Sequence, residues 1–172
     1  MRTHGTGRGI TGKIKSRRRL KDILTSHKRA GRRIVFTNGC FDILHYGHAE
    51  YLQKARGKGD ILVVAVNSDS SVRAIKGVQR PLVGENDRAR LVAALESVDY
   101  VTIFRETTPY EVIRALKPDI LVKGADWKKS AIVGAGLVKS GGGRVVTIKL
   151  APGRSTSRLI NKIAKTCTEQ TD

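Results

Sequence analysis

Short runs of apolar residues recur along the chain, and this feature constrains the fold more than any other. Between them lie segments whose apolar residues have the three- and four-residue spacing of a helix. Runs without polar alternation are typical of strands that are buried on both faces, as in a parallel sheet covered by helices. We therefore predict an α/β fold with a doubly wound, five-stranded parallel sheet. The five predicted strands are residues 34–36, 61–66, 100–104, 120–122 and 145–148.

The segments between these runs carry the start and stop signals of helices. Ser16 is placed to cap a first helix that ends at Ala30-Gly31, and Ser155 is placed to start the last one. In sheets of this kind ligands bind beyond the carboxyl ends of the strands. Polar residues that directly follow a strand are therefore the candidate site. The other predicted helices span residues 47–56, 86–96, 109–116 and 130–139.

Basic residues greatly outnumber acidic ones and are concentrated near the N-terminus. The 172 residues include 33 Lys and Arg against 15 Asp and Glu, which gives a net charge of +18. Such an excess favours anionic partners, either phosphates or nucleic acid. The first fifteen residues hold only two aliphatic side chains, Ile10 and Ile14. We therefore predict a flexible basic tail over residues 1–15, a single domain over 16–166 and a C-terminal tail over 167–172.

Composition also bears on the expected location. Two cysteines, Cys40 and Cys167, cannot build a disulfide framework, and neither is expected to be catalytic. No apolar run approaches the roughly 20 residues that span a bilayer. The N-terminal segment lacks the apolar core of a secretory signal. We expect a cytoplasmic protein with no membrane partner.

The most informative segment follows the first strand and reads TNGCFDILHYGH over residues 37–48. In it, His45 and His48 flank Gly47 where a helix is predicted to begin. Helix N-termini carry free N–H groups that attract phosphate, and imidazole N–H groups can donate to it. The histidines could instead hold a metal, although no third ligand is evident nearby, or could be structural. Neither a dinucleotide fingerprint nor a Walker A loop is present.

This segment carries a family resemblance. Gly39-x-Phe41-Asp42-x-x-His45-x-Gly47-His48 resembles the H-x-G-H signature of the nucleotidyltransferase superfamily, which includes the cytidylyltransferases and pantetheine-phosphate adenylyltransferase. Residues 32–165 resemble, more narrowly, the D-glycero-β-D-manno-heptose 1-phosphate adenylyltransferases. These occur alone and as the C-terminal domain of a bifunctional kinase/adenylyltransferase. The matching blocks are 35–42, 66–69, 76–77 with 80–81, 121–127 and 153–157.

The resemblance implies a Rossmann-like nucleotidyltransferase fold and a reaction of lipopolysaccharide biosynthesis. AMP would pass from ATP to the sugar 1-phosphate, giving ADP-heptose and pyrophosphate. The catalytic residues would be His45, His48 and Lys76. The nucleotide-binding residues would be Thr37, Asn38, Gly39, Phe41, Gly47, Lys123, Gly124, Asp126, Arg154, Ser155, Thr156 and Ser157. The sugar-phosphate-binding residues would be Asp42, Asn67, Asp69 and Arg80.

Several of these motifs also have a plain structural interpretation. Asn67-Ser68-Asp69 and Ser155-Thr156-Ser157 could simply cap helices, since Ser and Asp are good N-cap residues. Residues 76–81 could form a solvated basic loop, and Trp127 could be buried beside a glycine turn. Two other basic residues, Arg88 and Arg90, are expected to be surface charges.

One position departs from the cytidylyltransferase pattern. Some of these enzymes have an arginine about five positions before the Ser-Thr pair, where this chain has Leu150. Arg154 would then act from a shifted position. The departure counts against a cytidylyltransferase.

The expected cofactor is Mg²⁺, held mostly by ATP rather than by a carboxylate cage, so no protein metal site is predicted. A homodimer is expected. Within the same enzyme class, the alternative is CTP acting on glycerol 3-phosphate or a similar small phosphate. The charge of +18 also raises the possibility of a nucleic-acid-binding module. Against it stand an aromatic content of 5% and the absence of a recognised nucleic-acid motif.

Overall fold

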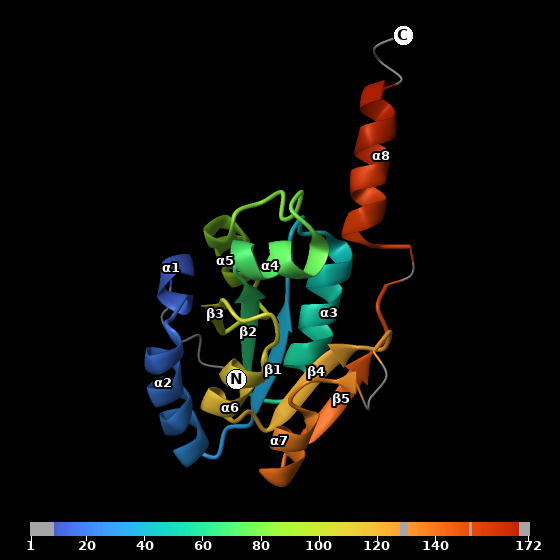
Figure 1. The fold of residues 1–172 in the computed structure, drawn as a ribbon. Helices are drawn as coiled ribbons and strands as arrows, with labels where there is room; N and C mark the ends of the chain where they lie inside the picture. The colour runs from blue at the N-terminus through green and yellow to red at the C-terminus, as the bar shows by residue number, and fades with distance from the viewer. Residues whose placement is uncertain (1–8, 128–130, 152, 169–172) are drawn as a thin grey trace.

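The protein forms a five-stranded parallel sheet flanked by helices (Figure 1), in a computed structural model that describes residues 9–127, 131–151 and 153–168. The strand order is β3-β2-β1-β4-β5, and every pairing is parallel. The predicted doubly wound α/β fold is therefore confirmed. The strands are β1 (Ile34–Gly39), β2 (Ile61–Asn67), β3 (Tyr100–Phe104), β4 (Ile120–Gly124) and β5 (Arg144–Ile148).

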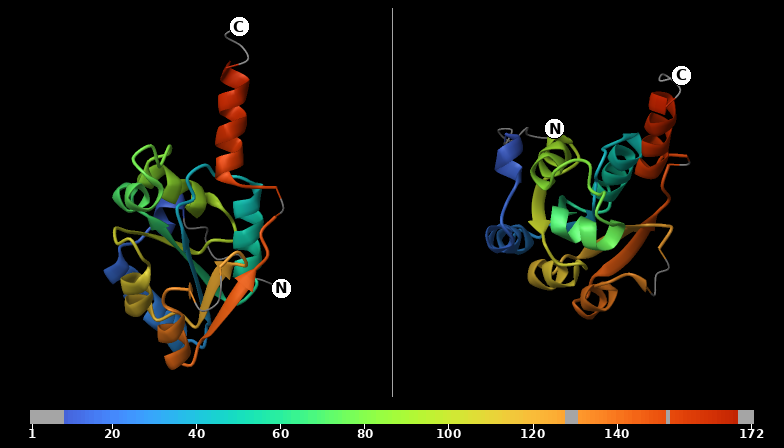
Figure 2. Two further views of the ribbon diagram at one scale, coloured as in Figure 1. Left: turned by 45° about the vertical axis from the view of Figure 1, so that its right-hand side comes forward. Right: turned by 45° about the horizontal axis from the view of Figure 1, so that its top comes forward.

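Helices cover both faces of this sheet, as the views in Figure 2 show. One face packs against α3 and α5, and the other against α2, α6 and α7. The strand β2 is buried over its whole length because it lies between two strands and two helical layers. The helices are α1 (Ile10–Lys13), α2 (Arg17–Arg29), α3 (Tyr46–Arg56), α4 (Asp69–Lys76), α5 (Glu85–Ala94), α6 (Tyr110–Leu116), α7 (Ala135–Ser140) and α8 (Thr156–Thr168).

Two strands run further than the sequence indicated, toward the edge where the site was expected. The strand β1 continues through Asn38 to Gly39, and β4 continues through Lys123 to Gly124. Parallel pairing with the neighbouring strands extends to these polar residues, since Gly39 pairs with Val66 and Gly124 with Ile148. Their side chains are therefore held by the sheet itself rather than by a loop.

Among the helices that connect strands, α4 and α7 differ from the prediction. The helix α4, which lies above the strands and below α8 in Figure 1, was not predicted. Ser68 caps it, with its hydroxyl accepting a hydrogen bond from the Ser71 N–H. The helix α7 begins at Ala135 rather than at residue 130, which lies outside the described residues.

Residues 10–15, expected to belong to a flexible tail, lie on the domain instead. They form α1 and a short parallel bridge from Ile14 to Val101 at the edge of β3. The Lys15 N–H donates to the Val101 carbonyl, and Ile14 packs against the core. An edge strand offers free backbone groups, so even a segment with few apolar residues can attach to it.

The other end of the chain is arranged differently. The helix α8 runs through Cys167, where a tail was expected to begin, and projects away from the sheet (Figure 2). None of the helices in the described ranges has the length and apolar character needed to cross a membrane.

Candidate active site

The H-x-G-H segment turns the chain from β1 into α3. His45 is the extended N-cap residue of α3, and Gly47 lies in its first turn. A Cβ added to Gly47 would lie 3.0 Å from His45 Cε1 and 3.1 Å from the Arg154 Cβ. A larger residue here would force the His45 ring or Arg154 to shift by a few tenths of an ångström, so glycine allows both to pack closely against this turn.

The two histidine rings are stacked face to face at the start of α3. Their centroids are 3.9 Å apart and their planes differ by 23°. Among the described residues, Nδ1 and Nε2 of His45 and Nδ1 of His48 are buried and have no hydrogen-bond partner. Buried polar groups in native proteins are nearly always paired, so three orphaned nitrogens in one cluster indicate a place for a ligand.

Both imidazoles are held in the neutral form. Burial lowers the pKa of His48 to about 4, and the nearby His45 acts in the same direction. Burial also lowers the pKa of His45, helped by the positive charge of Arg154. A neutral imidazole has one N–H donor and one acceptor. Near neutral pH each ring can therefore donate one hydrogen bond without carrying a charge of its own.

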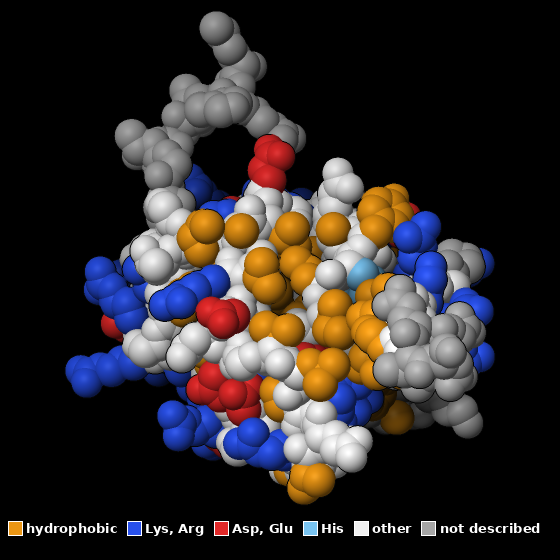
Figure 3. Space-filling model, turned by 90° about the horizontal axis from the view of Figure 1, so that it is seen from above, with side chains coloured by type: hydrophobic (Ala, Val, Ile, Leu, Met, Phe, Trp, Pro, Cys, Tyr) orange, Lys and Arg blue, Asp and Glu red, His pale blue; other side chains and the backbone are white. Residues whose placement is uncertain are grey.

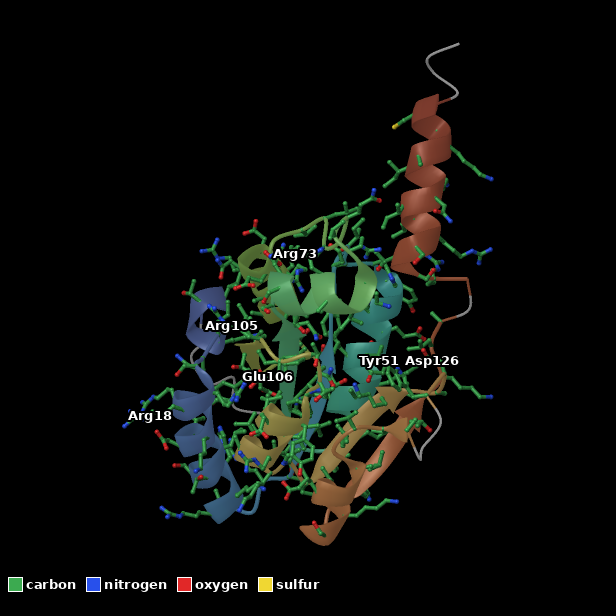
Figure 4. The ribbon with its side chains drawn as sticks, in the orientation of Figure 1. Arg18, Tyr51, Arg73, Arg105, Glu106 and Asp126 are labelled. Atoms are coloured by element: carbon green, nitrogen blue, oxygen red, sulfur yellow. The ribbon has the colours of Figure 1, made fainter. Side chains whose placement is uncertain are left out.

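Behind the histidines, the ends of β1 and β4 are joined by side chains. The Lys123 ammonium donates to Asn38 Oδ1 over 2.5 Å, and the hydroxyls of Thr37 and Tyr51 are 2.8 Å apart. Burial raises the pKa of Tyr51 to about 12. Figure 4 shows Tyr51 and Asp126 on the same side of the molecule, close to α3. The sequence-predicted nucleotide residues of these two strands are thus brought together.

Lys123 is only 8% exposed, yet it forms no ion pair with another described residue. Burial lowers its pKa to about 8, against the opposing effect of Asp126. Its ammonium lies 5.5 Å from the ring centre of Trp127, which is 49% exposed rather than buried as the structural interpretation required. An exposed indole beside a buried cation forms a surface that a planar or anionic ligand can contact.

The C-terminal motif lies against the histidines. The Arg154 guanidinium is 5.6 Å from the ring centre of Tyr46, next to His45. The Ser155 hydroxyl accepts from the Arg158 N–H and so caps α8, as predicted. The hydroxyls of Thr156 and Ser157 bond to none of the described side chains. Ser155 therefore has a capping role. The hydroxyls of Thr156 and Ser157 are not needed for the cap and remain available to a ligand.

The residues predicted to bind the sugar phosphate are engaged with the protein itself. Asp42 is 2% exposed and accepts hydrogen bonds from Arg80 at 2.6 Å and from the N–H groups of Leu82 and Val83. The buried Asn67 amide donates to the Ser71 hydroxyl. The Asp42 contacts hold the loop between α4 and α5 against the segment that follows β1, and the Asn67 contact joins the end of β2 to α4.

Arg88 was expected on the surface, and this expectation is wrong. Its side chain is fully buried and donates to the carbonyls of Cys40 and Val83 and to the Asp69 carboxylate. Its position in α5, next to the buried Ala89 and one turn before Val92, was the signal that placed it on the inner face. By contrast, Arg90 is exposed, as expected.

Lys76 ends α4 on the edge that carries the histidine loop. Burial raises the pKa of Cys40 in that loop, while the charge of Lys76 opposes this effect. Figure 3, which looks onto this edge, shows hydrophobic side chains gathered near its centre and basic ones around them. Exposed apolar residues of α4 and the following loop include Ile75, Val78 and Leu82.

The donor set contains no protein metal site within the described ranges. No group of three His, Cys, Asp or Glu side chains there is placed to hold an ion. Magnesium that arrives with ATP, coordinated by phosphate oxygens and water, needs no such group.

A phosphate-attracting helix mouth at the carboxyl edge of a parallel sheet, with the H-x-G-H sequence around it, defines a nucleotidyltransferase. The chain belongs to the cytidylyltransferase-like family, whose sequence profile matches residues 36–152.

The curated relatives named here are longer proteins. The chain is 54% identical over 151 residues to the bifunctional protein HldE of Syntrophotalea carbinolica, covering 88% of this chain and 31% of that protein. It is 48% identical over 167 residues to HldE of Geobacter sulfurreducens, covering 97% and 34%. The chain thus spans about a third of the length of these relatives.

Solved structures show the same architecture. The lipopolysaccharide core biosynthesis protein from Thermoplasma volcanium is 31% identical with a TM-score of 0.59, covering 70% of this chain and 98% of that one. Pantoate-beta-alanine ligase from Francisella tularensis has a TM-score of 0.61 at 16% identity, covering 84% and 68%. This second similarity concerns the fold alone.

Proposed function

We propose that the chain transfers AMP from ATP to D-glycero-β-D-manno-heptose 1-phosphate, forming ADP-heptose and pyrophosphate. The observation that carries the proposal is the set of three unpartnered, buried imidazole nitrogens of His45 and His48 at the start of α3. The substrate assignment is supported by about 50% identity to HldE proteins over most of this chain.

The reaction requires no covalent intermediate on the enzyme. An oxygen of the sugar 1-phosphate attacks the α-phosphorus of ATP, the new P–O bond forms, and the bond to the β-phosphate oxygen breaks in line to release pyrophosphate. Negative charge accumulates on the α- and β-phosphate oxygens during this step. The neutral rings of His45 and His48 would each donate an N–H to these oxygens.

Other residues would hold the nucleotide. Lys123 would bring positive charge from the end of β4, and Arg154 would bring it from the C-terminal motif beside His45. The free hydroxyls of Thr156 and Ser157 would add donors for phosphate oxygens. Trp127 and Asp126 would contact the base and ribose. Lys76 would reach the phosphates from α4.

We assign Asp42, Arg80, Asn67 and Asp69 an indirect role toward the sugar phosphate. Their side chains are occupied by hydrogen bonds within the protein, so they would position the backbone of the loop between α4 and α5. The sugar 1-phosphate would then contact that loop rather than these side chains.

Magnesium would enter with ATP and neutralise part of the triphosphate charge.

A homodimer is supported by α8, whose apolar residues Leu159, Ile160 and Ile163 are not buried in the chain. Light scattering of the purified chain tests this state: a monomeric mass would refute the dimer and leave the enzymatic proposal intact.

The decisive experiment measures pyrophosphate release. ATP and CTP are each combined with heptose 1-phosphate, glycerol 3-phosphate and other sugar phosphates, and the His48→Ala variant serves as the inactive control. We expect ATP with heptose 1-phosphate to give by far the highest kcat/KM. A preference for CTP with glycerol 3-phosphate would establish the alternative function.

A further inference from the structure

A second pocket lies on the opposite face of the sheet from α3, between α2 and the end of β3. Its volume is about 590 Å³. Arg17, Arg18 and Lys21 line it from α2, and Arg105 and Glu106 line it from the turn after β3. Figure 4 shows Arg105 and Glu106 near α2, across the molecule from Tyr51 and Asp126. The pocket is therefore distinct from the proposed active site.

The charges in this pocket do not balance. Arg17 Nη2 lies 2.6 Å and 2.9 Å from the two carboxylate oxygens of Glu106, the one acid in the pocket lining. Burial acts to raise the pKa of Glu106, but its bonds to Arg17 and to backbone N–H groups outweigh burial and lower it. Glu106 is thus ionised, and its charge is paired with that of Arg17. Arg18, Lys21 and Arg105 form no ion pair with any other described residue.

Arg18, Lys21 and Arg105 are exposed, so their unpaired charges face solvent and are open to an anion from it. The first turn of α2 contains no acidic residue, although the positive end of a helix disfavours cations and favours anions. Arg105 adds a further charge from a separate element. Unpaired cations from two elements that line one open depression produce a positive potential, which attracts anions to this surface.

We propose that this pocket binds a small molecule that carries a diphosphate group. The pocket is an open depression rather than an enclosed cavity, and its volume of about 590 Å³ is large enough for a small molecule. Three uncompensated cations match a diphosphate better than a single phosphate, which carries about −1.5 to −2 charges. Arginines bind phosphate oxygens through paired N–H groups, and Lys21 adds a point charge. Ile103 and Ala115 line the same pocket and provide an apolar wall for an organic part of the ligand.

The diphosphate has two chemical sources, free pyrophosphate and a nucleoside diphosphate. NMR titrations of the full chain with pyrophosphate, ADP and inorganic phosphate, each without Mg²⁺, distinguish them. Backbone amides of residues 17–21 and 103–106 report on this pocket, and those of 45–48 report on the active site. We expect saturable shifts in the first set with pyrophosphate or ADP, and at least tenfold weaker binding of inorganic phosphate.

Two double variants test whether the diphosphate binds at this pocket. Arg18→Gln with Arg105→Gln should weaken diphosphate binding at residues 17–21 and 103–106 by about tenfold or more, because charge-assisted hydrogen bonds are lost. The control, Arg29→Gln with Arg144→Gln, removes the same charge from exposed positions elsewhere and should leave this binding unchanged. Shifts at residues 45–48 should be the same in both, which separates this pocket from the proposed catalytic activity.

Three results would overturn the proposal. The first is the absence of saturable shifts at the pocket with either diphosphate. The second is equal weakening in both double variants, which would mean that only the overall charge matters. The third is tighter saturation of the same amides by a short single-stranded RNA, which would assign the surface to nucleic acid.

Discussion

Two neighbouring regions at the carboxyl edge of the sheet differ in whether their polar side chains have hydrogen-bond partners. In the loop between α4 and α5 and in the first turn of α5, the guanidinium groups of Arg80 and Arg88 have partners. Arg80 bonds to Asp42, and Arg88 bonds to Asp69 and to two backbone carbonyls. At the start of α3, three buried ring nitrogens of His45 and His48 have no hydrogen-bond partner within the described part of the chain.

This difference distinguishes residues that shape the site from residues that act on the ligand. An unsatisfied buried polar group costs about 1–3 kcal/mol, so unpaired nitrogens are tolerated where a ligand satisfies them. A buried arginine with all its partners contributes instead to the shape of the site. The histidine region should therefore control turnover, and the arginine region should control stability.

The largest effect is expected in the arginine region. Arg88→Met leaves the Asp69 carboxylate and the carbonyls of Cys40 and Val83 without their donor, which should lower the free energy of unfolding by about 3–5 kcal/mol. Urea denaturation measures this change. Arg90→Met, on the exposed side of the same helix, is the matched control and should change it by less than about 0.5 kcal/mol. Equal stability of the two variants would contradict the structural role of Arg88.

Next in size is the effect of the histidines on turnover. His45→Ala or His48→Ala should reduce kcat about 100-fold or more, because a donor to the developing charge is lost. Neither ring forms a hydrogen bond with another of the described side chains, so the melting temperature should change little. Pyrophosphate release and thermal unfolding are measured on the same preparations. Near-native turnover in both variants would show that the unpaired nitrogens are not catalytic.

A smaller effect should appear in the dependence of stability on pH. The folded protein holds the pKa of His48 at about 4, below its ordinary value near 6.5. Between these values the unfolded chain binds the extra proton, so the stability of the wild type should fall as the pH falls from 6.5 to 4. His48→Gln should show a shallower fall over that window. Parallel curves for the two proteins would mean that His48 titrates normally in the fold.

The smallest change in stability is expected at the start of α8. Thr156→Val should leave the melting temperature nearly unchanged while it lowers kcat/KM for ATP, since Thr156 has a free hydroxyl. Ser155→Ala removes the cap and should cost about 1 kcal/mol of helix stability. If Thr156→Val retains full kcat/KM, the hydroxyls of this motif do not hold phosphate.

Local patterns in the sequence were sufficient for the sheet and for much of the candidate site. The strand at 61–66 is apolar throughout, and such a run has few alternatives to a strand buried on both faces. The pair His45 and His48 was identifiable because it follows a strand and opens a helix. Both signals depend on residues close together in the chain.

The structure was needed to identify contacts between residues that are far apart in the sequence. The helix pattern could place Arg88 on an inner face, but its role could be assigned only once its acceptors at Cys40, Asp69 and Val83 were known to converge on it. Ile14 attaches to the domain because the edge of β3 at Val101 is open to it.

The sequence by itself determined the alternation of strands and helices and the residues that follow each strand, because burial periodicity and helix capping act over a few residues. Only the tertiary structure decided which of those polar residues pair with each other and which remain free. Burial removes water as a partner, so each polar group must then depend on whatever the fold brings near it.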